Sequence, residues 1–118
     1  MAKDIQLGHL DIAACSALQS LDGIGPAARI QHIHLAGCPL INDLGPIAKV
    51  RDLRSVEISS LEGLHRIPSF AYPEMLSSLS IFFCKSLADL SGLKGLPSTT
   101  TVSVSHCPMV RWAGTKQL

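Results

Sequence analysis

Residues 30–38 read IQHIHLAGC, and this stretch contains the pattern that decides the fold. Its apolar residues are Ile30, Ile33, Leu35 and Cys38, spaced as in L-x-x-L-x-L-x-x-C. The pattern occurs 23 residues earlier, and then every 23 residues along the chain, without insertion or deletion. The five copies, LGHLDIAAC, IQHIHLAGC, LRSVEISSL, LSSLSIFFC and TTTVSVSHC, begin at residues 7, 30, 53, 76 and 99. A fixed period of this length predicts a solenoid built from one structural unit per repeat.

Two spacings inside each repeat predict its local structure. Leu10 and Ile12 alternate with His9 and Asp11, and this period of two indicates a strand with one buried face. After the cysteine position, the apolar residues follow at intervals of three, which fits a 3₁₀ turn better than an α-helix. We therefore expect one parallel sheet with a strand from each repeat, and a 3₁₀ or irregular segment behind each strand.

Length and composition limit the class of protein. The 118 residues are enough for a single domain, residues 1–118, and a hydrophobic content of 47% with only 4% aromatic residues predicts an aliphatic core. A net charge of +1 offers no electrostatic footprint for nucleic acid or for a membrane. The N-terminal residues lack the long apolar segment of a secretory signal, so we expect a cytoplasmic protein.

The four cysteines occupy one position of the repeat. Cys15, Cys38, Cys84 and Cys107 are spaced by the period, and Leu61 fills the same position in the third copy. A position that accepts leucine is a buried apolar position, where a free cysteine behaves as a small hydrophobic residue. There is no C-x-x-C pair to suggest zinc, and we expect reduced thiols with no metal and no cofactor. A disulfide between Cys15 and Cys38, on adjacent coils, is the alternative.

The five copies resemble the leucine-rich repeat family, with Cys or Leu at the position where that family usually has Asn. The resemblance runs from residue 7 to about residue 112. It implies an α/β-class repeat solenoid that is mostly β: a right-handed leucine-rich-repeat coil with a five-stranded parallel concave sheet and a 3₁₀ or irregular convex side. The family's Asn hydrogen-bonds the turn after the strand, whereas a thiol bonds only weakly and Leu61 cannot bond at all.

The outward strand positions are the candidate site, because a solenoid usually binds through its extended concave surface. They form three rows across the strands, and the middle row begins Asp11, His34, Glu57. This row is a solvated polar surface, a recognition patch for a basic or polar partner loop, or a metal or acid–base site. Phe82 is expected to be a binding anchor, and Phe83 is either a second anchor or a residue that completes the core. The predicted partner-binding residues are His9, Asp11, His32, His34, Ser55, Glu57, Ser78, Ser80, Phe82, Phe83, Thr101 and Ser103.

The sequence contains no catalytic motif, and its serines have no obvious general base, so we do not expect an enzyme. We expect a protein–protein interaction module that binds a partner protein, not nucleic acid and not a membrane. One alternative is a stand-alone bacterial immunity protein that neutralises a toxin. Another is a self-associating fragment of a larger repeat receptor, since few residues precede the first coil to cover its open edge. At the other end, Trp112 is expected to cap the last layer.

Overall fold

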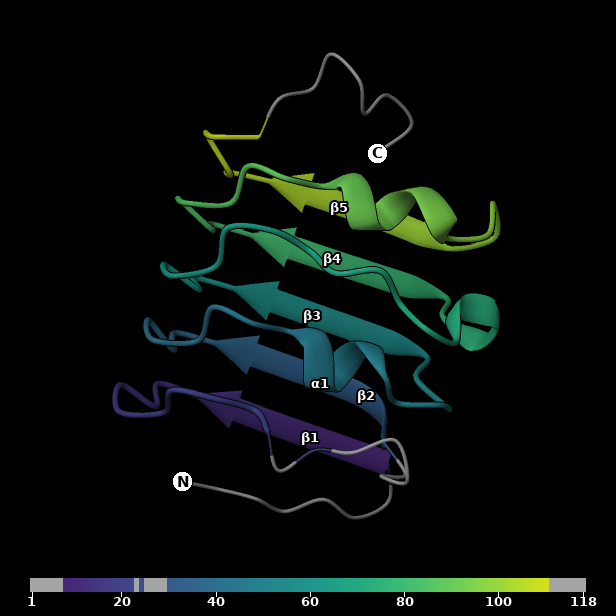
Figure 1. Cartoon of the computed structure of the whole chain (residues 1–118), viewed down its shortest axis with the longest axis horizontal. Coiled ribbons are helices and arrows are strands. Elements are labelled where there is room, and N and C mark those ends of the chain that lie inside the picture. The colour runs from purple at the N-terminus through teal and green to yellow at the C-terminus, as the bar shows by residue number, and fades with distance from the viewer. Residues whose placement is uncertain (1–7, 23, 25–29, 111–118) are drawn as a thin grey trace.

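A computed structural model describes residues 8–22, 24 and 30–110. These residues form one open parallel sheet of five strands in the order β1-β2-β3-β4-β5 (Figure 1). The strands are β1 (Gly8–Ala13), β2 (Ile30–Ala36), β3 (Ser55–Ser59), β4 (Ser78–Phe82) and β5 (Thr101–Ser105). The prediction of a parallel sheet with one strand from each copy of the pattern is confirmed.

The strands pair almost without stagger. From His9 onward each residue of a strand lies beside the residue 23 positions later, as in His32 beside Ser55 and Ser55 beside Ser78. Because side chains alternate between the two faces of a strand, this register aligns equivalent side chains into continuous rows. The buried positions of each repeat therefore meet each other, and so do the outward ones.

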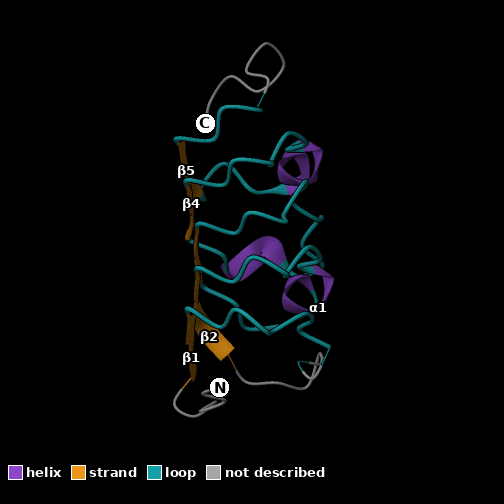
Figure 2. Ribbon diagram, turned by 90° about the vertical axis from the view of Figure 1, so that its left-hand side faces the viewer, coloured by secondary structure: helices purple, strands orange, loops and turns teal. Residues whose placement is uncertain are grey.

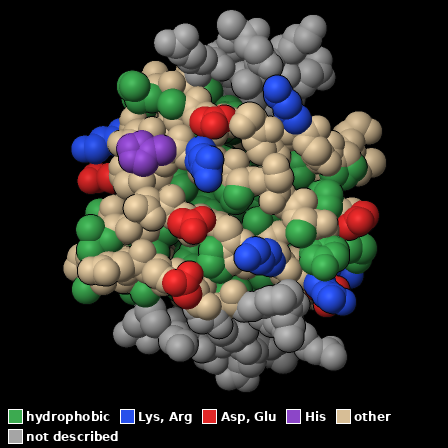
Figure 3. Space-filling view, in the orientation of Figure 1, with side chains coloured by type: hydrophobic (Ala, Val, Ile, Leu, Met, Phe, Trp, Pro, Cys, Tyr) green, Lys and Arg blue, Asp and Glu red, His purple; other side chains and the backbone are tan. Residues whose placement is uncertain are grey.

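The return segments lie on one side of the sheet (Figure 2). They contain a short α-helix α1 (Gly45–Ala48) and the 3₁₀ helices η1 (Pro73–Met75) and η2 (Ser91–Gly95). The spacing of three is matched by hydrogen bonds between residues three apart, such as the 3.0 Å bond from the Leu93 amide to the Leu90 carbonyl. α1 differs from the expected 3₁₀ or irregular chain, because the Ala48 amide bonds the Leu44 carbonyl four residues earlier. The outer surface of this side carries acidic and basic side chains interspersed (Figure 3).

The core lies between the sheet and the return segments and is aliphatic. Ile58 and Leu79 from the strands, and Leu87 from a return segment, are fully buried. Burial of such a side chain stabilises the fold by about 1.5–3 kcal/mol relative to exposure. Val102 and Val104 of β5 are only partly buried, so packing is densest in the middle of the sheet.

The cysteine position lies just beyond each strand, where the chain turns towards the core. Cys38 and Cys84 are buried, and each thiol donates to the carbonyl two residues earlier at 3.5 Å. All four cysteines are free. The copy with Leu61 keeps the same turn without a thiol, because the Ser60 amide bonds the Phe82 carbonyl at 3.0 Å. Main-chain bonds therefore support this turn, which explains why neither Asn nor Cys is required.

Several expectations fall on residues outside the described ranges. Trp112, expected to cap the last layer, and the residues before Gly8, expected to be too few to cover the edge of the first strand, are among them. The single-domain assignment for residues 1–118 stays a prediction. Within the described ranges, no helix is long and apolar enough to cross a membrane.

Candidate functional site: the open sheet face

We call the outward-facing side of β1–β5 the open sheet face. Its side chains form three rows across the strands, in agreement with the predicted rows. The rows are His9, His32, Ser55, Ser78 and Thr101; then Asp11, His34, Glu57, Ser80 and Ser103; then Ala13, Ala36, Ser59, Phe82 and Ser105. The predicted partner-binding residues all lie in these rows except Phe83, which directly follows β4.

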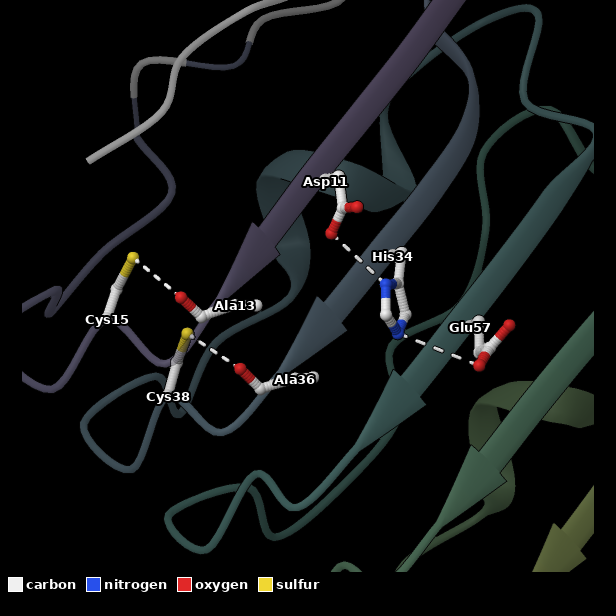
Figure 4. Close-up of polar contacts among 7 residues, drawn as sticks. All are labelled: Asp11, Ala13, Cys15, His34, Ala36, Cys38 and Glu57. Atoms are coloured by element: carbon white, nitrogen blue, oxygen red, sulfur yellow. Dashed lines mark hydrogen bonds and ion pairs between the residues drawn. The ribbon is translucent and has the colours of Figure 1, made fainter.

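Asp11, His34 and Glu57 make continuous contact across three strands (Figure 4). The Nδ1 atom of His34 lies 3.1 Å from Oδ1 of Asp11, and its Nε2 atom lies 3.6 Å from Oε2 of Glu57. A neutral imidazole can donate from only one nitrogen, whereas a protonated one donates from both. Only the contact with Asp11 has hydrogen-bond length, and the approach to Glu57 is an ion pair only when His34 is protonated.

The first row places imidazoles beside each other at the start of the sheet. The rings of His9 and His32 lie 5.3 Å apart between centroids. Nδ1 of His32 is also 2.7 Å from the hydroxyl oxygen of Ser55. The expectation that no serine has a neighbouring base is therefore wrong for Ser55. His32 and Ser55 are one repeat of 23 residues apart, and this spacing was the signal in the sequence that the two side chains would be neighbours.

No group of three or more His, Cys, Asp or Glu side chains within the described ranges is arranged to hold a metal ion. The predicted alternative of a metal or acid–base site used His9, His32, His34, Asp11 and Glu57. What the structure shows for these residues is pairwise contact between neighbouring strands rather than convergence on one point.

The aromatic end of the face is formed around β4. Phe82 is partly buried in the third row, whereas Phe83 is 55% exposed and does not complete the core. The Phe83 ring stacks on the imidazole of His106, with centroids 4.5 Å apart and planes at 21°. His106 was not among the predicted site residues, although it lies 23 positions after Phe83 and so occupies the equivalent place in the next repeat.

Beside the charged side chains, on β4 and β5, the face carries small hydroxyl side chains. Ser78, Ser80 and Ser103 project little beyond the sheet, so a partner backbone could approach closely and exchange hydrogen bonds with them. The face thus combines an ionic row, a hydroxyl surface and an aromatic edge on adjacent strands.

No protein-family model matches this chain, and no solved structure matches it significantly. The geometry of the open sheet face is therefore the basis on which a function can be argued.

Proposed function

We propose that this chain is a non-enzymatic, cytoplasmic interaction module of the leucine-rich-repeat type, which binds a partner protein through the open sheet face. In this proposal the sheet is the concave side of a right-handed repeat coil. The unbroken 23-residue period and the in-register parallel strands support it.

One observation carries the proposal: ionic, hydroxyl and aromatic side chains lie together on one face, in rows set by the register. The ionic contacts of His34, the hydroxyls of β4 and β5, and the exposed Phe83 are all at or beside this face. Aromatic side chains anchor interfaces well, because they bury a large area with little loss of conformational freedom. A regular surface with mixed chemistry suits contact with another protein.

The Ser55–His32 pair is the strongest feature in favour of catalysis, and its surroundings argue against that role. A serine nucleophile needs a histidine base that a third group orients, and donors that stabilise an oxyanion. The His32 ring also lies against the His9 ring, and within the described ranges it forms no hydrogen bond or ion pair with a carboxylate. We therefore assign Ser55 and His32 to binding.

Site-specific photo-crosslinking tests the proposal. A benzoylphenylalanine replaces Ser80 in the middle of the open sheet face, and a matched variant carries it at Ser69, an exposed serine in the return segment. In lysate of the source cell, we expect a discrete protein adduct from position 80 and none from position 69. Adducts that form equally at both positions, or only at position 69, would contradict binding through this face.

The identity of the adduct separates the remaining functions. An adduct with a toxin would support the immunity-protein alternative, and an adduct with a second copy of the chain would support self-association. Both variants should first be shown to keep the wild-type circular dichroism spectrum, so that loss of crosslinking reports on the surface.

A further inference from the structure

We infer that the partner segment on the open sheet face carries a Lys or Arg side chain at the Asp11–His34–Glu57 row, and an apolar side chain four residues away. This inference rests on the proposed function and specifies which side chains the bound partner segment carries. It comes from the distribution of charge on the face and from the distance between its ionic and aromatic ends.

The charge of the open sheet face differs in sign from that of the chain. The fifteen positions of its rows contain two carboxylates, Asp11 and Glu57, and no Lys or Arg. With neutral imidazoles the formal charge of the face is therefore −2, although the whole chain carries +1. The return-segment side carries both signs interspersed (Figure 3). Complementary charge steers association and suppresses wrong partners, which favours a cationic segment on this face.

The carboxylates are placed to receive such a cation. Asp11 and Glu57 are 66% and 56% exposed, and each contacts His34 through a single oxygen (Figure 4). The second oxygen of each group can accept further hydrogen bonds, and a guanidinium offers five donors in a fixed fork. The neighbouring Ser55 and Ser80 are small, so they leave room for a long side chain to reach the row.

Phe82 determines where the apolar side chain of the partner segment should lie. It lies two strands beyond His34 and one outward position further along the strand direction. With strands about 4.8 Å apart and a rise of about 3.3 Å per residue, the separation is about 12 Å. An extended peptide covers about 13 Å in four residues, and its side chains at that spacing point to the same side. An apolar side chain at that spacing would meet Phe82 and the exposed Phe83–His106 stack.

Selection from a display library of random linear 12-residue peptides tests the inference. We expect peptides enriched on the wild-type chain to contain Lys or Arg with an apolar residue four positions away. Their affinity should fall about two- to thirtyfold for the Asp11→Asn/Glu57→Gln double variant, the range that two exposed ion pairs give. Glu62→Gln is the matched control. Glu62 is also 56% exposed but lies in a turn beside Lys85, so its removal should leave affinity unchanged.

A second variant separates failure of the inference from failure of the proposed function. Ser80→Trp blocks the middle of the face without changing its charge. Peptides that lose binding to Ser80→Trp, but bind the Asp11→Asn/Glu57→Gln variant normally, would overturn the cationic partner and leave the face as the binding site. Peptides insensitive to every face variant would overturn both. A library that yields no enriched peptide would overturn the linear cationic segment. The crosslinking experiment would then test separately whether a partner binds through the open sheet face.

Discussion

The residue before each cysteine position adopts a left-handed backbone conformation. Ala14, Ser60, Phe83 and His106 have φ values of +55° to +57°, and Gly37 has φ +66°. For residues other than glycine this conformation costs about 1–2 kcal/mol. At Ala14, Gly37, Ser60 and Phe83 the cost is offset because the amide continues the hydrogen bonding of the sheet. An example is the 2.9 Å bond from the Ala14 amide to the Ala36 carbonyl.

The buried thiols predict a loss of stability at alkaline pH. Burial raises the pKa of Cys38 and the pKa of Cys84 above their ordinary value of 9.0. The folded state thus holds these protons more tightly than the unfolded state. The contribution is complete below about pH 9 and is lost as the pH rises through the raised values. In urea denaturation from about pH 7 to pH 11, each thiol should lower the free energy of unfolding by at most about 1.4 kcal/mol per pH unit.

The control is the Cys38→Ala/Cys84→Ala variant, which lacks both buried thiols. It should be less stable at neutral pH because of the small cavities, but its free energy of unfolding should fall less steeply above pH 9. Equal slopes for the two proteins would show that other groups cause the alkaline loss.

At the scale of elements, η2 offers a matched pair of glycines. A Cβ atom added at Gly92 would clash with the Ile67 carbonyl oxygen and lie 2.5 Å from backbone atoms of Pro68, whereas one at Gly95 would meet nothing within 4 Å. We expect Gly92→Ala to lower the free energy of unfolding by about 1–3 kcal/mol or more, because the backbone must move. Gly95→Ala should leave it unchanged or raise it by up to about 1 kcal/mol. Thermal and urea denaturation of both variants measures the difference, and similar losses would contradict this close packing of η2.

The elements also show what could be predicted from the sequence. The strands and their rows followed from the period, because an unbroken repeat leaves only one register that buries every apolar position. The helix α1 could not be predicted, since the difference between hydrogen bonds three and four residues apart is settled by local packing. The Phe83–His106 stack was missed for another reason. Side chains at this left-handed position range from Gly37 to Phe83, so no residue type marks it as a site.

At the scale of the whole molecule, the same substitution should have different effects in the middle and at the end of the sheet. Val56 and Val102 occupy the same position of the repeat, but Val56 is buried and Val102 is only partly buried. We expect Val56→Ala to lower the free energy of unfolding by about 2–3 kcal/mol and Val102→Ala by about 1 kcal/mol or less. Chemical denaturation of both variants tests this. Equal costs would mean that β5 is packed as tightly as β3.

The strand order gives the molecule a mechanical character. Among the described residues each strand pairs with the strands before and after it in the chain and with no other. A load applied between β1 and β5 therefore passes through every strand-to-strand contact in series. A chain of links in series yields at its weakest link, and the partly buried valines place that link at the β5 end rather than in the middle. Each repeat that unfolds releases 23 residues, which extend to about 80 Å before the next strand-to-strand contact carries the load. A partner bound across β1 to β4 would share the load with the strand-to-strand contacts that it spans.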